Sequence, residues 1–252
     1  MIKIAYILSV ALLFSIGSEA QTNVRDSVIL APLISVAYTF QIPGGDLKDR
    51  FGNNSAVGIS FMVKDKHNFV YGLSGNFLFG KSLKETDILT EVTTSNGYII
   101  NNEGLYADVR LYERGYSFQL HFGKQFAILA PNDNSGFYIM GGIGMLQHKI
   151  KIDVINNDVP QLRDEYLHGY DRLTNGISFS QTVGYRLLSS SRLTNLFIEV
   201  EIVEAFTKNR RSYNIDLPNG VDDKNRFDML TGFRFGWSVP LYKKMPREYY
   251  FN

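Results

Sequence analysis

The chain has no cysteine in its 252 residues. This absence excludes disulfide bonds, thiolate catalysis, cysteine-based zinc sites and lipid attachment at an N-terminal cysteine. An excess of charge of one sign is also missing, because 26 Lys and Arg residues nearly balance 25 Asp and Glu residues, for a net charge of +1. We therefore expect no nucleic-acid partner and no general attraction to anionic surfaces.

Long apolar runs are scarce beyond the N-terminus. The longest, residues 28–37, is broken by Pro32 and Ser35, whereas a membrane-spanning helix needs roughly 18 to 20 consecutive apolar residues. If the chain occupies a membrane, it does so as a closed β-barrel, because lipid cannot satisfy the backbone of an open sheet edge. The many Tyr, Phe and Gly residues suit such a barrel, and they suit a soluble β-sandwich equally.

The first twenty residues have the layout of a secretory signal peptide. Lys3 is basic, residues 4–16 are apolar apart from two serines, and Ser18 and Ala20 stand where a signal peptidase requires small residues. We predict cleavage before Gln21 rather than an uncleaved anchor, because the apolar run is short. Residues 21–252 are then one exported domain, with residues 243–252 as a tail.

Apolar residues alternate with small or polar ones through most of the chain, which predicts β-strands. Ile34, Val36 and Tyr38, for example, share one face, and Ser35 and Ala37 share the other. Further segments alternate in the same way: 57–64, 69–79, 177–187, 198–206 and 233–239. Residues 136–152 form a longer, glycine-rich segment with weaker alternation.

Residues 105–128 change phase at Gly115: apolar residues are odd-numbered up to Leu111 and even-numbered from Phe118. A hairpin at residues 114–115 explains this with nine strands, and one long strand with a bulge at Gly115 explains it with eight. The bulge makes long and short connections alternate, which is typical of transmembrane barrels. We therefore predict an all-β, eight-stranded antiparallel transmembrane β-barrel with long external loops and short periplasmic turns. Ten strands are the remaining alternative.

The polar face of the strands is rich in Gly, Ser, Thr and Ala and carries few charges. A water-exposed sheet carries many more Lys and Glu residues, so this face suits a narrow barrel lumen. We predict that Glu199 and Glu201 meet Arg186 and Arg234 there, because a buried charge without a partner costs several kcal/mol. An ion-pair plug is favoured over a gated ion or proton path.

No residue pattern indicates catalysis. None of the histidines, His67, His121, His148 and His168, has the spacing of a metal site. We expect no enzyme activity, no metal and no cofactor.

Two aromatic segments are candidate partner contacts. In the third long loop, Tyr166, Tyr170, Asp171 and Arg172 either fold over the barrel mouth, which we favour, or form a binding surface. In the tail, the aromatic residues belong to an interfacial girdle, to an assembly signal or to a periplasmic docking site; these are Tyr249, Tyr250 and Phe251.

Five short strings carry a resemblance to a family: 43–52 (PGGDLKDRFG), 106–115 (YADVRLYERG), 146–150 (LQHKI), 169–176 (GYDRLTNG) and 184–186 (GYR). They resemble the PorG-like small outer-membrane barrels of the type IX secretion system of Bacteroidota. The resemblance implies a non-enzymatic scaffold that associates with a periplasmic ring of the secretion and gliding apparatus. The alternatives are an adhesion barrel that binds through its external loops and a loop-borne enzyme.

Overall fold

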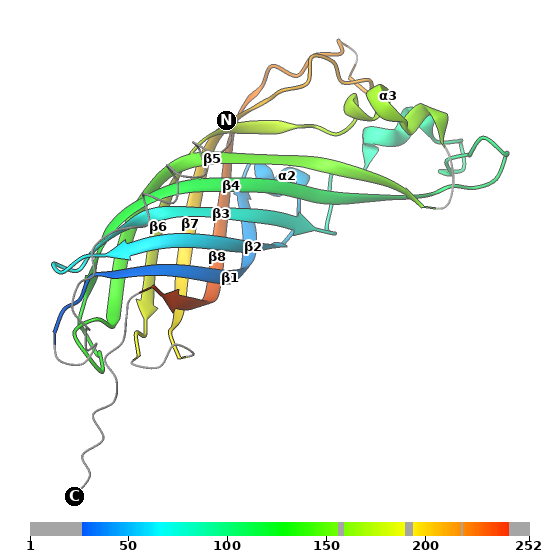
Figure 1. Cartoon of the computed structure of the whole chain (residues 1–252). Coiled ribbons are helices and arrows are strands. Elements are labelled where there is room, and N and C mark those ends of the chain that lie inside the picture. The colour runs from blue at the N-terminus through cyan, green and yellow to red at the C-terminus, as the bar shows by residue number, and fades with distance from the viewer. Residues whose placement is uncertain (1–26, 156–158, 190–193, 218, 242–252) are drawn as a thin grey trace, which may run out of the picture.

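The computed structural model describes residues 27–155, 159–189, 194–217 and 219–241 (Figure 1). Eight antiparallel strands pair in chain order, and the last pairs with the first, so that the sheet closes into a barrel. The prediction of eight strands is therefore confirmed. The strands are β1 (Ala31–Gly45), β2 (Asn54–Lys64), β3 (Phe69–Gly80), β4 (Asp108–Phe126), β5 (Gly136–Ile155), β6 (Thr174–Arg186), β7 (Leu196–Asn209) and β8 (Asn225–Pro240).

The connections at the two ends of the barrel differ. At the loop end, residues 46–53, 81–107, 156–173 and 210–224 join the strands, and they hold the helices α2 (Leu47–Arg50), η1 (Asp87–Val92), η2 (Pro160–Leu162) and α3 (Asp164–His168). At the turn end the connections are 65–68, 127–135 and 187–195. The predicted alternation of lengths is not strict, because β1 reaches Gly45 and leaves 46–53 shorter than 127–135. Within the described residues, no helix is long and apolar enough to cross a membrane.

The predicted bulge at Gly115 is wrong. Gly115 pairs with Leu78 of β3 and with His148 of β5, and the register on both sides continues without a skipped residue. The phase changes because the apolar residues change sides: Leu111 faces inward, whereas Leu120 faces outward. Beyond their neighbours, β4 and β5 continue as a two-stranded arm, residues 108–112 paired with 151–155 (Figure 1).

The outward face of the barrel is an apolar belt. Phe118, Leu120, Ile198 and Phe235 are each more than half exposed, and every strand contributes to the surface. A water-soluble protein does not leave so large a continuous apolar surface uncovered. The oily face therefore contacts lipid, and a soluble sandwich is excluded. The belt includes Ile34, Val36, Ile59, Phe61, Leu73, Phe122, Ile139, Ile143, Ile177, Val183, Val200, Phe233 and Trp237.

The lumen is filled in three layers. A polar layer in the middle includes Ser74, Asn76 and His121. Toward the turn end it is covered by two apolar clusters, Met62, Val70, Tyr138 and Met140 in one and Ile29, Ala31, Leu33 and Leu188 in the other. Toward the loop end it is covered by a larger cluster that includes inward-facing residues of five strands, Ala56, Leu78, Leu146, Val203, Ala205 and Leu230. The barrel has a packed core rather than an open pore.

Candidate functional site

Arg234 is the centre of the polar layer. Its guanidinium donates to Glu199 Oε1 at 2.9 Å and to Glu201 Oε2 at 2.9 Å. Two further bonds go to Thr39 Oγ1 at 3.0 Å and Asn76 Oδ1 at 3.1 Å. Four of the five N–H groups of a guanidinium are thereby satisfied, by residues of three other strands, β1, β3 and β7. These contacts form what we call the plug.

Sequence reasoning placed Arg186 beside Glu199 and Glu201, but no ion pair joins it to either carboxylate. Arg186 lies over the ring of Tyr138, with its guanidinium carbon 4.7 Å from the ring centroid, and the hydroxyl of Tyr138 donates to the other oxygen of Glu199. The sequence prediction therefore missed the aromatic side chain of Tyr138, which lies between Arg186 and Glu199. Because Arg186 and Arg234 together balance the two glutamates, the layer is electrically neutral.

Little free space remains around the plug. A cavity of about 20 Å³ lies between Ser74, His121, Arg186 and Glu199, which is room for about one water molecule. His121 accepts or donates a bond with Ser74 at 2.8 Å through Nε2. This histidine is a lumen residue, and the described residues contain no group of three His, Asp or Glu side chains that would hold a metal ion.

The loops fold into a cap, and its apolar residues belong to the same cluster that closes the lumen at the loop end. Leu47 and Phe51 come from the first loop, and Ile88 and Leu89 from the second. They pack with Ile150 on the inner face of β5, and with Ile152, Val159, Leu162 and Tyr170. A two-stranded arm alone is marginally stable in water, so this burial is what keeps the arm ordered beyond the barrel.

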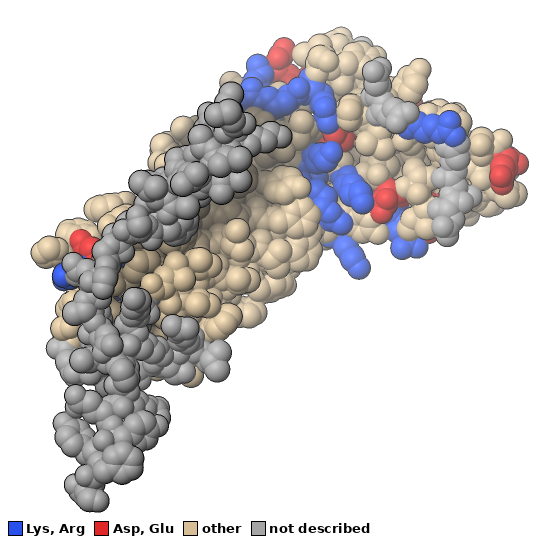
Figure 2. Space-filling model, in the orientation of Figure 1, with Lys and Arg blue, Asp and Glu red and all other residues tan. Residues whose placement is uncertain are grey.

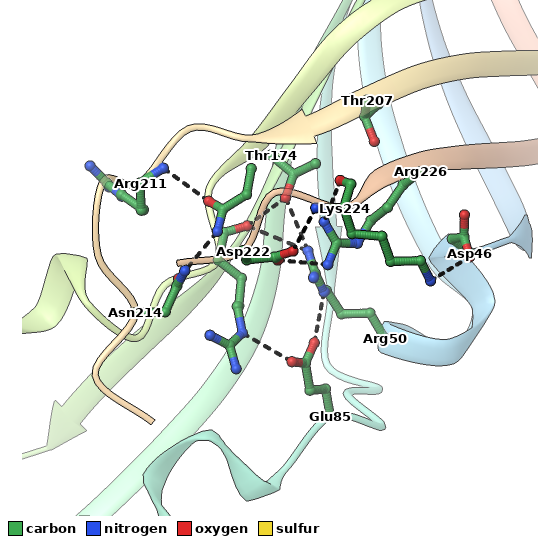
Figure 3. A network of polar contacts seen from close by, with 12 residues as sticks. Asp46, Arg50, Glu85, Thr174, Thr207, Arg211, Asn214, Asp222, Lys224 and Arg226 are labelled. Carbon is green, nitrogen blue, oxygen red and sulfur yellow. Dashed lines mark hydrogen bonds and ion pairs between the residues drawn. The ribbon is translucent and has the colours of Figure 1, made fainter. Parts of the chain in front are cut away.

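Ion pairs tie the four loops of the cap together (Figure 3). Glu85 accepts from Arg50 Nε at 2.7 Å and from Arg172 Nε at 3.0 Å, and Arg172 also pairs with Asp216. Lys224 pairs with Asp46 at 3.2 Å and so joins the first loop to the fourth. Each loop is thereby bonded to at least two others.

Arg50 is a buried cation of this network, with 7 % of its surface exposed. Besides Glu85, it donates to Thr174 Oγ1 at 3.1 Å and to the Arg172 carbonyl. Burial lowers the pKa of Arg50. Burial also raises the pKa of the Glu85 carboxyl, but Arg50 and Arg172 outweigh it and hold that pKa below its usual value. Glu85 is therefore an ionised carboxylate shared by two arginines.

The third loop places its four candidate residues in different environments. Tyr170, Asp171 and Arg172 are buried, whereas Tyr166 is 65 % exposed. Asp171 accepts two bonds from Arg211, at 2.7 and 2.5 Å, and Arg172 adopts a positive φ of 52°. This loop folds over the mouth, and of the four only Tyr166 is available to a partner. The candidates Tyr249, Tyr250 and Phe251, the tail 243–252 and the signal segment 1–20 lie outside the described residues.

The sequence analysis did not predict the buried pair of His148 and Asp228. His148 Nε2 lies 2.9 Å from Asp228 Oδ2, which also accepts from Thr207 at 2.5 Å, and the Phe51 ring stands edge-on to the imidazole. The only sequence signal was the inward phase of His148 in β5. Because both side chains are buried, they brace β5 against β8 beneath the cap.

The strings of the family resemblance converge in space. Arg50, from string 43–52, donates to Arg172 and Thr174, both from string 169–176. Phe51 packs on His148 of string 146–150, and Leu111 of string 106–115 packs against the same core. Four of the five strings therefore meet at the loop end of the barrel; the fifth, 184–186, ends β6 at the turn end.

Comparison with known proteins gives similarities of fold. No family model and no curated protein matches the chain. Among solved structures, Neisserial surface protein A matches with 9 % identity, 82 % of this chain and 96 % of that chain covered, and a TM-score of 0.41. Ail, the attachment invasion locus protein of Yersinia pestis, matches with 10 % identity, 84 % and 99 % covered, and 0.41. The outer membrane protein OprG from Pseudomonas aeruginosa matches with 12 % identity, 86 % and 99 % covered, and 0.38.

Proposed function

We propose that this protein is a closed outer-membrane barrel that acts as a non-enzymatic anchor or scaffold of a cell-envelope complex. The observation that carries this proposal is the sealed lumen: Arg234, Glu199 and Glu201 lie between apolar layers at both ends. A barrel so filled offers no path for solutes. What it offers to other molecules is its surface, at the loop end outside the cell and at the turn end in the periplasm.

Membrane insertion has a direct test. The purified chain should migrate faster on a gel when unheated than after boiling, and it should stay in the membrane fraction after an alkaline carbonate wash. In planar bilayers it should conduct little. Release by carbonate would contradict the membrane placement, and a large steady conductance would contradict the sealed lumen alone.

We further propose that the complex is the type IX secretion apparatus and that the partners are its periplasmic ring proteins. The family resemblance supports this, and four of its five strings meet at the loop end of the barrel. The test is co-purification from detergent-solubilised membranes of the native host. Wild type should recover large periplasmic proteins, and deletion of residues 243–252 should lose them while the heat-dependent gel shift is retained. Recovery of the barrel alone from wild type would contradict the ring assignment.

A second candidate function is adhesion through the cap. The rings of Tyr98 and Tyr106, both in the second loop, pack at a tilt with their centroids 4.5 Å apart, and both side chains are more than half exposed. Exposed aromatic pairs of this kind are frequent binding hot spots. If the protein is an adhesin, replacing both tyrosines with serine should abolish its binding to cell surfaces and leave co-purification of the ring proteins unchanged. Unchanged binding to cell surfaces by this variant would favour the scaffold.

A further inference from the structure

The apolar belt ends abruptly at the loop end of the barrel. On β4 the last outward-facing belt residue is Tyr116, and the next outward residue is Arg114. On β7 the corresponding step is from Phe206 to Lys208. These two strands thus change from an aromatic to a basic side chain over a single outward position.

Arg114, Lys149, Lys208 and Arg210 form what we call the basic band. Arg114 stands directly opposite Lys149 in the β4–β5 register, and like charges in that arrangement destabilise a sheet. Figure 2 shows Lys and Arg side chains gathered where the tan lower surface gives way to the upper part of the molecule. The fold therefore keeps positive charges together at this height although they repel each other.

The band has more positive charge than its carboxylates neutralise. Arg114 donates to the Glu113 carbonyl, and Arg210 donates to Asn175 Oδ1 at 2.6 Å; within the described chain neither is ion-paired. Lys149 lies 3.6 Å from Asp171, but that carboxylate already binds Arg211 at 2.5 Å. Lys208 pairs with Asp223, whose side chain is 79 % exposed.

Beside the band, the surface is hollowed. A hollow of about 480 Å³ is lined by Phe206 and Phe227 together with Lys208, Arg210 and Arg226, and by Asp46. The carboxylate of Asp46 is already engaged by Lys224 and by the Phe227 N–H at 2.8 Å. The hollow therefore combines an aromatic wall continuous with the belt and a cationic wall continuous with the band.

We propose that the basic band and its hollow bind the phosphate-bearing headgroup of an anionic lipid in the outer leaflet. This inference rests on the proposed membrane placement. Basic side chains next to a lipid surface attract anionic headgroups, and their aliphatic stems lie along the acyl boundary. The aromatic wall selects a ligand with a lipid tail over a soluble anion, which would leave Phe206 and Phe227 uncovered.

Native mass spectrometry of the full chain in detergent, folded as judged by the heat-dependent gel shift, tests the proposal. The probes are bisphosphorylated lipid A and phosphatidylcholine, with inorganic phosphate as a soluble competitor. Wild type should retain lipid A in preference to phosphatidylcholine. The double variants Arg114→Gln/Lys149→Gln and Lys208→Gln/Arg210→Gln should each weaken retention about tenfold or more, since each basic residue near a lipid surface contributes substantially.

The control Lys48→Gln/Lys66→Gln removes two exposed lysines that lie outside the band, one in α2 and one in a turn at the opposite end. It should retain lipid A as wild type does. Equal retention of lipid A and phosphatidylcholine by wild type would overturn the proposal, as would displacement of lipid A by inorganic phosphate. Loss of the gel shift in wild type would instead count against the membrane placement on which it rests.

Discussion

The middle of the barrel and the arm are built from the same two strands, β4 and β5, but their apolar side chains face opposite sides of the sheet. In the middle, Leu120 of β4 and Ile143 of β5 face outward as a direct cross-strand pair. In the arm, Leu111 and Ile152, also a direct pair, face inward against the loops. The strands do not change register between these places, so the change lies in the solvent, from lipid to water. A hydrophobic pattern that reverses along one strand can thus mark the membrane boundary.

The plug and the cap also bury charge differently. The plug holds Arg234 against two carboxylates, with all three side chains less than 8 % exposed. In the cap, Glu85 is 30 % exposed although its two arginine partners are buried. A mutation that removes one member of an ion pair in the plug leaves the other charge buried and uncompensated, whereas the same change in the cap leaves a charge that water can still reach. We expect the cost of mutation to follow this order.

The largest effect is expected from Arg234→Met, which strands Glu199 and Glu201 in the lumen. The change should destabilise the folded barrel by about 3–5 kcal/mol, the usual cost of breaking a buried pair from one side. Urea unfolding in detergent micelles measures it. The matched triple variant Arg234→Met/Glu199→Gln/Glu201→Gln should recover most of the loss, and a triple variant as unstable as the single one would contradict the account.

A smaller effect is expected when a charge is placed on the belt. Ile143→Arg puts a guanidinium against acyl chains and should cost about 2–4 kcal/mol in a bilayer. Lys151→Ile, an opposite exchange on the outward face of the arm, should change stability by less than about 0.5 kcal/mol. Unfolding titrations in lipid vesicles compare the two. Similar costs would mean that both positions face the same solvent.

Ile88→Ala removes a buried side chain that the second loop contributes to the apolar cluster, and it tests whether the cap loosens without the barrel. The cavity should weaken the cap by about 2 kcal/mol, at the low end for such truncations because the loops are able to close in. Hydrogen exchange should accelerate in residues 81–107 and not in the middle of β4. Acceleration throughout the sheet would show that the cap and the barrel unfold together.

The smallest effect is expected from titrating Glu85. Its folded pKa lies below its ordinary value of 4.5, so its stabilisation is complete above that value and is lost as the pH falls through the folded pKa. Lowering the pH to about 3 should therefore loosen the cap, by about 1 kcal/mol for so exposed a carboxylate. Exchange rates of the loop amides measure it, and Glu85→Gln should reduce the pH dependence of the cap, with the remainder coming from Asp46 and Asp222, whose pKa values are also lowered by their hydrogen-bond and ion-pair partners.

Much of the fold was predictable because strand alternation is local. The period of two located all eight strands, and the small polar residues on one face indicated a narrow lumen. The position of Arg234 among the inward-facing residues followed from the same count. The predicted bulge at Gly115 was wrong because alternation shows which face of a strand is apolar but not whether that face contacts lipid or the protein interior.

Folding of the third loop over the mouth was predicted, but the contacts within the cap were beyond sequence reasoning, because they join residues far apart in the chain. Arg50 and Thr174 bond over 124 positions, and nothing near either residue in the sequence indicates the other. The same holds for His148 and Asp228, and for Tyr138, whose ring separates Arg186 from Glu199.

The amino-acid sequence by itself determined that this chain forms a closed sheet with one oily and one small-residue face, because side chains on a strand alternate between two sides. Only the tertiary structure decided where along each strand the oily side turns inward, and which charges meet. Those outcomes depend on closure of the sheet, which brings distant strands within hydrogen-bonding distance. They also depend on the loops, which cover the apolar side chains of the arm as lipid covers those of the barrel.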